Sequence, residues 1–335
     1  MDKHPNNIDA LMALGAECYA HLKSLWQHTL LGIADNITYN PSLNHILLDI
    51  LGVGLLPTYQ FLHTQQPSFA AFEQWILAQN SGNLTATTIA QCQQLFSATL
   101  TSAIPTNEAV LSEEDLDFWD THGYVIIKNA VSKEDCTAAC DAIWKYLQMD
   151  AADSNSWYQA SDAVQGIMVP LYRHAAIDAN RNNPVIKKAF QQLWGHEGLV
   201  VTTDKCGFNP PETAAYTYRG IGLHWDVSLA QPIPFGTQGI LYLTDTAAHQ
   251  GALTVVPGFH HQISDWLYHY SKDTHPRDDD FTAFEKVAIA GNAGDFIIWN
   301  HLLPHSSSAN KATTPRLVQY INWYDPLQKV ADSWI

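Results

Sequence analysis

Histidine and carboxylate side chains with the spacing of metal ligands occur in the last third of the chain. Among the sixteen histidines, only His224 is followed two positions later by a carboxylate, Asp226. Residues i and i+2 of a strand point to the same face, so both side chains could reach one ion. The pair alone is equally typical of a surface histidine beside an acid, so the metal interpretation needs a third ligand.

A third ligand and an anion-binding group are present downstream. A strand-like run over 295–300 leads into a loop with two histidines, His301 and His305, and the next predicted strand opens with Arg316. Two histidines and one carboxylate leave open positions on a metal, as in non-haem Fe(II) oxygenases. The planar guanidinium of Arg316 suits a two-point grip on a carboxylate, such as the distal one of a 2-oxo diacid.

Another class of protein could use the same three ligands. A Zn²⁺-dependent hydrolase or a non-catalytic metal-binding jelly-roll protein also takes histidine and aspartate around its ion. Arg316 would then have no role in binding. A role for this arginine therefore separates the oxygenase hypothesis from the other two.

The elements that must position these residues are short and rich in β-branched residues. Short runs of such residues, bounded by Gly, Pro and Asn, predict strands at 123–128, 199–203, 239–244, 252–256, 295–299 and 316–323. Capped helices are predicted to begin at Ser112 and Ser132, each with an aspartate three residues later. The pattern indicates an α+β fold with an antiparallel barrel or double-sheet jelly roll, whose mouth can hold a metal and small ligands.

Residues 1–110 have a different character. Apolar residues spaced by three or four predict helices at 8–34, 43–51, 68–79 and 87–100, broken around Pro41, Pro57 and Pro67. This part has two lysines, no arginine and no chemical motif. We expect a helical region of unknown role over 1–110, a boundary at 104–108, and a catalytic domain over 111–335.

Composition excludes several functional classes. The 335 residues are 46% hydrophobic with 11% aromatic residues, which excludes a disordered chain. A net charge of -16 disfavours nucleic acid and anionic membrane surfaces as partners. The five cysteines form no C-x-x-C pair, and the N-terminus lacks the pattern of a signal peptide, so we expect reduced thiols and a cytoplasmic location. The apolar run 46–56 is too short for a membrane span and predicts a buried helix.

Taken in order, these motifs resemble the phytanoyl-CoA dioxygenase family of Fe(II)/2-oxoglutarate-dependent oxygenases. The resemblance spans about residues 111–325 and includes the runs FWDTHGYVII from 118, QGILYLTD from 238 and GALTVVPGFH from 251. It also includes His224-Trp-Asp226 and Leu-Pro-His305, followed eleven residues later by Arg316. It implies a double-stranded β-helix core, jelly-roll or cupin-like, with flanking helices and an N-terminal helical extension.

The resemblance implies a role for each matching residue. His224, Asp226 and His305 would bind iron, with His305 preferred to His301 because the family separates this ligand from the arginine by eleven residues. Arg316 would bind the far carboxylate of 2-oxoglutarate, assisted by the hydroxyl of Ser307 and, beside the cosubstrate, by the aromatic ring of Tyr242. The implied cofactors are Fe(II), 2-oxoglutarate and O₂, with succinate and CO₂ as coproducts.

The retained carboxylate at position 226 favours hydroxylation, desaturation or oxidative ring closure, because related halogenases carry a small residue there. A chain of charge -16 without a Lys/Arg cluster attracts a CoA polyanion poorly, so we expect a small neutral or amine-bearing substrate, such as an amino-acid-like or secondary metabolite. The segment 264–281 is either an insertion over the pocket or a solvated loop. Candidate wall residues, each equally consistent with packing or a surface ion pair, are Trp225, Tyr172, Arg173 and Arg219.

Overall fold

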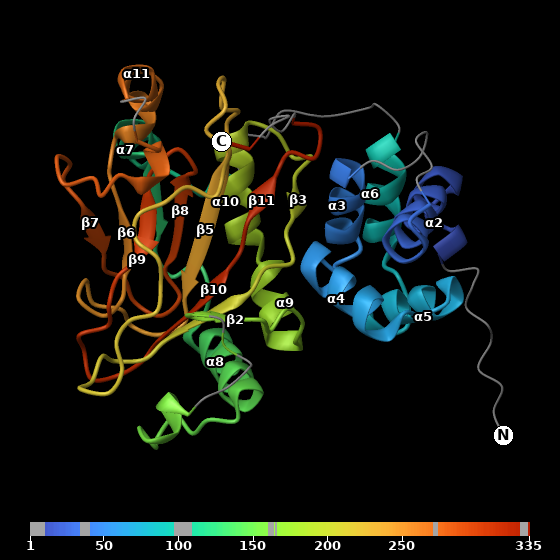
Figure 1. Cartoon of the computed structure of the whole chain (residues 1–335), viewed down its shortest axis with the longest axis horizontal. Helices are drawn as coiled ribbons and strands as arrows, with labels where there is room; N and C mark the ends of the chain where they lie inside the picture. The colour runs from blue at the N-terminus through green and yellow to red at the C-terminus, as the bar shows by residue number, and fades with distance from the viewer. Residues whose placement is uncertain are drawn as a thin grey trace. The chain divides into compact units, whose positions relative to one another are not determined.

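The computed structural model describes residues 11–33, 41–96, 109–159, 164, 166–270, 274–328 and 334–335. The chain forms two compact units (Figure 1): Met1–Ala103 with His196–Thr203, and Ile104–Gly195 with Asp204–Ile335. The first unit therefore recruits a short segment from the middle of the chain, which the sequence did not indicate. The predicted boundary at 104–108 lies outside the described residues.

The first unit is helical, as predicted. Its elements are α2 (Ala16–Leu31), α3 (Pro41–Ile50), α4 (Leu55–Gln65), α5 (Phe69–Gln79), α6 (Ala86–Phe96) and the short β3 (Val200–Val201). Helix α2 buries Cys18, Leu22 and Leu25, the face that the apolar spacing predicts. Helix α4 was not predicted, because Pro57 was interpreted as a helix breaker. Pro57 lies in the first turn of α4, where a missing N–H is tolerated.

Among the described residues, no single helix is long and apolar enough to cross a bilayer, and one bent pair of helices, Leu43–Ile50 with Leu55–Gln65, could do so by length and composition only.

The second unit contains a six-stranded sheet in which all described pairings are antiparallel. The strand order is β1-β8-β5-β10-β4-β2. The predictions at 123–128, 239–244, 295–299 and 316–323 correspond to four of these strands, whereas β2 and β4 were not predicted. The bounds are β1 (Tyr124–Ile127), β8 (Phe296–Asn300), β5 (Thr237–Tyr242), β10 (Arg316–Tyr320), β4 (Cys206–Asn209) and β2 (Met168–Val169).

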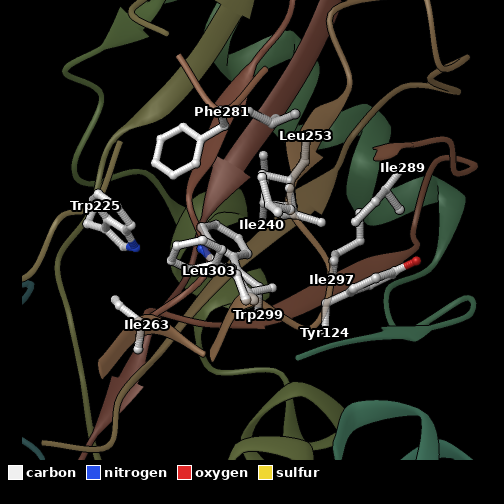
Figure 2. Packing of buried hydrophobic residues seen from close by; sticks show 14 of the residues in the cluster. Tyr124, Trp225, Ile240, Leu253, Ile263, Phe281, Ile289, Ile297, Trp299 and Leu303 are labelled. Atoms are coloured by element: carbon white, nitrogen blue, oxygen red, sulfur yellow. The ribbon is translucent and has the colours of Figure 1, made fainter. Parts of the chain in front are cut away.

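A three-stranded antiparallel sheet completes the β-structure of the site. Its order is β7 (Val287–Ile289), β6 (Leu253–Val255) and β9 (His305–Ser307). Hydrophobic residues of both sheets share one cluster, to which β5 and β8 contribute Ile240 and Ile297 and the smaller sheet contributes Leu253 and Ile289 (Figure 2). The buried Tyr242 hydroxyl donates to the Ile289 carbonyl at 2.7 Å and accepts from the Leu253 N–H at 3.0 Å. Tyr242 therefore ties the two sheets together.

Helices cover the other face of the large sheet. Phe190 of α10 (Pro184–Trp194) packs on Phe296 of β8 at a ring-centroid distance of 5.9 Å, and Trp144 of α8 (Lys133–Leu147) packs on Phe208 of β4 at 5.4 Å. The predicted caps are confirmed: the Ser112 and Ser132 side chains accept from the N–H groups three residues later. The remaining elements are α7 (Glu113–His122), η2 (Ser156–Tyr158), α9 (Ala175–Arg181), η3 (Phe259–His261), α11 (Ile263–His269), η4 (Pro276–Asp278) and β11 (Trp323–Tyr324). The unit is thus a mixed α and β structure with antiparallel sheets.

A buried carboxylate holds the turn before β8. Asp295 accepts hydrogen bonds from Lys128 Nζ at 2.9 Å, from the Asn129 N–H at 3.0 Å and from the Asn292 N–H at 2.9 Å. Burial by itself raises the pKa of Asp295, but these donors outweigh it and hold the pKa below its ordinary value. The folded protein therefore binds this proton less tightly than the unfolded chain, so the stabilisation exists above the ordinary aspartate pKa and is lost as pH falls through the lowered one.

We predict that Asp295→Ala lowers the free energy of unfolding by about 2–4 kcal/mol at neutral pH, because two buried N–H groups lose their acceptor. Urea unfolding followed by near-UV circular dichroism measures the change. The difference from wild type should shrink as pH falls below the ordinary aspartate pKa and through the lowered pKa of Asp295, where the carboxylate becomes protonated. Lys128→Met is the control and should cost less than about 1 kcal/mol, since the lysine is half exposed. An unchanged midpoint for Asp295→Ala would refute this role.

Candidate active site

A backbone pairing brings two histidines side by side. The His224 N–H donates to the His305 carbonyl at 3.0 Å, and the His305 N–H donates to the His224 carbonyl at 3.0 Å. Directly opposed residues of an antiparallel pair project to the same side, and the imidazole centroids lie 4.7 Å apart. On its other side, β9 pairs with β6, with His305 opposite Val255. The position of His305 is thus fixed from both edges of a three-residue strand.

Asp226 completes a group of three possible ligands. One carboxylate oxygen, Oδ1, lies 3.5 Å from His224 Nε2, and the other, Oδ2, lies 3.3 Å from His305 Nε2. One ligand atom from each of the three residues lies within 4.8 Å of the others. The side chains of His305, His224 and Asp226 are 6%, 25% and 54% exposed, so the group is closed behind His305 and open at Asp226. A small molecule can approach from the Asp226 side.

The hydrogen bond made by Nδ1 of each imidazole determines which ring nitrogen is free to bind a metal. His224 Nδ1 lies 2.8 Å from the Gly222 carbonyl, and His305 Nδ1 lies 3.2 Å from the Leu303 carbonyl. A carbonyl only accepts hydrogen bonds, so each Nδ1 carries a proton, and each Nε2, the atom directed at Asp226, is the one that can bind a metal. Metal-binding histidines are oriented in this way.

The protonation states also suit a cation. Burial, followed by the neighbouring His305 ring, lowers the pKa of His224, which favours the neutral imidazole. Burial would raise the pKa of Asp226, but the His305 ring and the Gln238 amide hold it well below its usual range. Two nitrogen lone pairs and a carboxylate converge here, so the donor set fits a divalent metal with positions left open.

A buried guanidinium lies beside the histidine strand. Ser307 follows His305 by two residues, and its hydroxyl accepts a hydrogen bond from Arg316 Nη1 at 3.0 Å. Arg316 is fully buried, and its Nε and Nη2 atoms have no hydrogen-bond partner. Across the described ranges, Arg316 forms no ion pair with an acidic side chain. A buried charge without a counter-charge is unfavourable by several kcal/mol, so an anionic ligand such as a carboxylate fits this position.

Tyr242 lies in the wall next to this guanidinium. It is opposite Val318 on β10, and burial raises the pKa of its phenol to about 12, against the effect of the Arg316 charge. Because the Leu253 N–H and the Ile289 carbonyl already use its hydroxyl, the ring is the part that remains to contact a cosubstrate.

Two residues of the site were missed by sequence reasoning. Gln238 Nε2 donates to Asp226 Oδ2 at 2.7 Å, and the Tyr218 hydroxyl donates to the Ser307 carbonyl at 2.6 Å. Gln238 alternates with Ile240 and Tyr242 on the inward-facing side of β5, and a polar residue in this position could have indicated a polar contact in the site. Tyr218 lies in a loop without periodicity and carried no such signal.

His301 and the histidines after the Pro-Gly turn are directed elsewhere. His301 Nε2 lies 2.7 Å from the Pro234 carbonyl, and burial lowers the pKa of His301 to about 4. His260 and His261 both contact the Asp120 carbonyl, through Nε2, at 3.0 and 2.6 Å. None of the three belongs to the ligand group with Asp226.

Trp225, a candidate for the substrate wall or for packing, lies in the core. Its indole N–H donates to the Leu302 carbonyl at 2.8 Å, and its ring packs against Phe259. It also packs against Phe281 (Figure 2). Adjacent residues of an extended segment face opposite ways, so Trp225 points into the core when its two neighbours point to the site.

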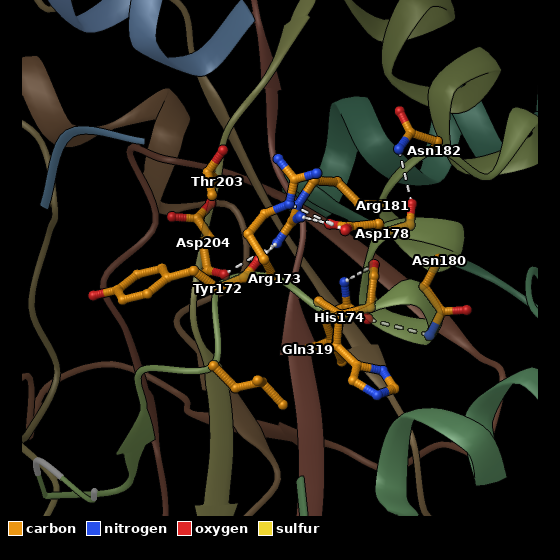
Figure 3. Close-up of polar contacts among 12 residues, drawn as sticks. Tyr172, Arg173, His174, Asp178, Asn180, Arg181, Asn182, Thr203, Asp204 and Gln319 are labelled. Atoms are coloured by element: carbon orange, nitrogen blue, oxygen red, sulfur yellow. Dashed lines mark hydrogen bonds and ion pairs between the residues drawn. The ribbon is translucent and has the colours of Figure 1, made fainter. Parts of the chain in front are cut away.

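Tyr172 and Arg173 lie near the opposite end of β4 from the guanidinium of Arg316. Arg173 Nε donates to Asp178 at 3.1 Å, and Arg181 donates to Asp178 and to the Tyr172 carbonyl (Figure 3). These residues follow β2, which pairs with the Cys206 end of β4, whereas Arg316 pairs with the Asn209 end. Their contacts are those of an ion-pair network that anchors α9. Arg219 is exposed, with its guanidinium 5.4 Å from the Tyr216 ring centre.

The chain is similar to several known proteins. A relative from Dictyostelium discoideum, named for phytanoyl-CoA dioxygenase, is 24% identical over 257 residues, covering 61% of this chain and 73% of its own. The solved carbocyclase SnoK of nogalamycin biosynthesis, described as non-heme and alpha-ketoglutarate-dependent, is 18% identical with a TM-score of 0.47, covering 68% of this chain and 87% of its own. EctD from S. alaskensis with bound Fe is 17% identical with a TM-score of 0.47, covering 66% and 80%.

The family assignment rests on the sequence model of the phytanoyl-CoA dioxygenase (PhyH) family. That model matches residues 119–318, which are more than half of the chain and include the three candidate ligands and Arg316. The chain therefore belongs to the phytanoyl-CoA dioxygenase family, and it is a non-haem dioxygenase that uses Fe(II), 2-oxoglutarate and O₂.

Proposed function

We propose that His224, Asp226 and His305 are the iron ligands of this dioxygenase, and that Arg316 and Ser307 bind the distal carboxylate of 2-oxoglutarate. The observation that carries the proposal is the buried guanidinium of Arg316, which has two unpartnered N–H positions beside the histidine strand. A dicarboxylate bound with one end at the three ligands would supply the missing negative charge with the other. Tyr242 would contact the cosubstrate through its ring.

This feature separates the proposal from a hydrolase. A Zn²⁺ site could use the same three side chains. It would leave Arg316 as an uncompensated buried charge, which is an unfavourable arrangement without a ligand. The 2-oxo acid accounts for both parts of the site.

The reaction is the oxidation of a C–H bond in a small molecule, with succinate and CO₂ as coproducts. Bound Fe(II) supplies the redox chemistry that couples decarboxylation of 2-oxoglutarate to this oxidation. The chain's own contribution is to direct the Nε2 atoms of the two imidazoles at the metal position, to keep Asp226 ionised, and to orient the cosubstrate through its distal carboxylate. The core behind His305 excludes water from that side of the site.

For the fold of this domain, we propose the double-stranded β-helix that the resemblance implies. The six- and three-stranded sheets, joined through Tyr242, would form it.

For the location, we propose a reducing compartment such as the cytosol. The five cysteines are all buried and free of disulfides, which supports this location.

For the substrate, we propose a small neutral or amine-bearing molecule that enters from the exposed side of Asp226. The net charge of -16 supports this class over a CoA polyanion. Arg219, five residues before His224 and exposed, is the wall candidate that could contact a substrate carboxylate. Trp225 packs in the core, Arg173 pairs with Asp178, and the Tyr172 carbonyl accepts from Arg181 at the other end of β4, so we assign none of the three a substrate contact.

We predict that His305→Ala abolishes stoichiometric Fe(II) binding, whereas His301→Ala retains it. The reason is that His305 Nε2 faces the ligand group, whereas His301 Nε2 faces a backbone carbonyl. Anaerobic Fe(II) titration followed by calorimetry measures both variants, with circular dichroism as the folding control. Retention of iron by a folded His305→Ala together with its loss from His301→Ala would reverse the assignment.

We predict that Arg316→Met weakens 2-oxoglutarate binding by about thirty- to several-thousand-fold, the equivalent of roughly 2–5 kcal/mol for one lost partner of a buried charge pair. Iron binding and thermal stability should persist, since methionine removes an unpaired buried charge. The readout is the metal-to-ligand charge-transfer band of the anaerobic Fe(II)–2-oxoglutarate complex. Ser307→Ala should have a smaller effect. An affinity within about threefold of wild type for Arg316→Met would exclude it as the anchor.

A further inference from the structure

Gln238 and Trp299 form a hydrogen-bonded chain that ends on Asp226. The two residues are directly opposite on β5 and β8, so their side chains project to the same face of the sheet. Trp299 Nε1 donates to Gln238 Oε1 at 3.1 Å, and Gln238 Nε2 donates to Asp226 Oδ2 at 2.7 Å. The ring of Trp299 also packs on the His305 imidazole, with centroids 5.1 Å apart.

The chemistry of these groups fixes the direction of the chain. An indole N–H can only donate, so the amide oxygen of Gln238 must face Trp299. The amide NH₂ is then the end that faces the carboxylate, where a donor is needed. The reversed amide would place two donors together and a carbonyl against a carboxylate. Trp299 thus determines which end of Gln238 meets Asp226.

Asp226 needs such a partner more than the two histidines do. His305 is held by β6 and by the backbone pairing with His224, whereas the Asp226 side chain is 54% exposed. When both Nε2 atoms serve as ligands, neither imidazole can donate to Asp226. Gln238 is then the side chain, among the described residues, that still donates a hydrogen bond to this carboxylate.

We infer that Gln238 is a positioning residue that holds Asp226 through Oδ2, so that the carboxylate acts as a one-oxygen ligand and leaves the remaining positions for the cosubstrate and O₂. Trp299 acts through Gln238 by fixing its amide. The inference rests on the proposed function, since it assumes that Asp226 is a metal ligand. A carboxylate without this hydrogen bond is free to rotate and to present both oxygens to the ion.

The test compares metal binding in three variants of the full chain. Gln238→Met keeps the volume and removes the hydrogen bond, and the affinity for Co(II), measured by calorimetry, should fall about 10- to 100-fold. Trp299→Phe keeps the ring against His305 but frees the amide, and should cause a smaller loss. Adding Trp299→Phe to Gln238→Met should cause little further loss, because the indole acts through the glutamine.

Gln319→Met is the matched control. Gln319 is a buried glutamine of β10 in the same sheet, with hydrogen bonds to Asn180 and to the Ile177 carbonyl, on the face that α9 covers. It should lower the urea midpoint and leave Co(II) affinity within about twofold of wild type. A structural role for Gln238 would give the same result as this control, so the pair separates stability from metal positioning.

A second readout follows the cosubstrate. At saturating Fe(II) without O₂, Gln238→Met should shift the charge-transfer band of the 2-oxoglutarate complex, because the carboxylate ligand changes its geometry. Co(II) affinity within about twofold of wild type and an unmoved band in Gln238→Met would overturn the inference while leaving the iron site intact. Failure of wild type itself to bind Co(II) or Fe(II) would instead refute the proposed function. If Gln238→Met did not fold, Trp299→Phe would decide by the same two readouts.

Discussion

The site depends on the pairing of β9, a strand of three residues, on both of its edges. On one edge His305 is opposite Val255, and on the other it exchanges two backbone hydrogen bonds with His224. This pairing places both imidazoles on one side, and the period of two along an extended chain then adds Asp226 and Ser307. One local constraint therefore positions the three candidate metal ligands and the hydroxyl that contacts Arg316. A change of one residue in this register would turn His305 and Ser307 away from the site.

The second constraint is electrostatic. The protein keeps a guanidinium fully buried with two unpartnered nitrogen atoms, and burial of an unpaired charge opposes folding. The tight packing of the hydrophobic cluster around Tyr242 and Val318 offsets this free-energy cost. The guanidinium charge therefore remains available for a ligand. In the proposed function, binding energy gained at the distal carboxylate would orient the 2-oxo acid end at the three candidate ligands.

Much of the site could be predicted from the sequence, because its residues lie in short motifs with fixed spacing. The same holds for strands β1, β5, β8 and β10, whose apolar runs are bounded by turn residues. Strands β2 and β4 escaped prediction because Met168–Val169 is only two residues long and Cys206–Asn209 contains a glycine and an asparagine. Helix α10 escaped prediction too, although Asn183 caps its start and Pro184 follows.

The loop predicted around His305 is in fact strand β9, and this miss and the following ones are tertiary in origin, because the pairing partner β6 is distant in the sequence. The side on which Trp225 packs depends on where the aromatic rings of Phe259 and Phe281 lie, and these come from distant segments. The contact of Gln238 with Asp226 joins β5 to the segment of His224. The ion pair between Arg173 and Asp178 depends on where α9 begins. Sequence spacing does not determine contacts of this kind.

The central claim is that Arg316 is buried to receive the distal carboxylate of a 2-oxo diacid. The most direct measurement compares 2-oxoglutarate with 2-oxopentanoate, which has a methyl group in place of that carboxylate, on the anaerobic Fe(II)-loaded wild-type protein. The charge-transfer band gives both dissociation constants. We predict that 2-oxoglutarate binds at least about thirtyfold more tightly, the equivalent of roughly 2 kcal/mol from one buried charge pair. Equal affinities for the two acids, or no saturable band with 2-oxoglutarate, would contradict the account.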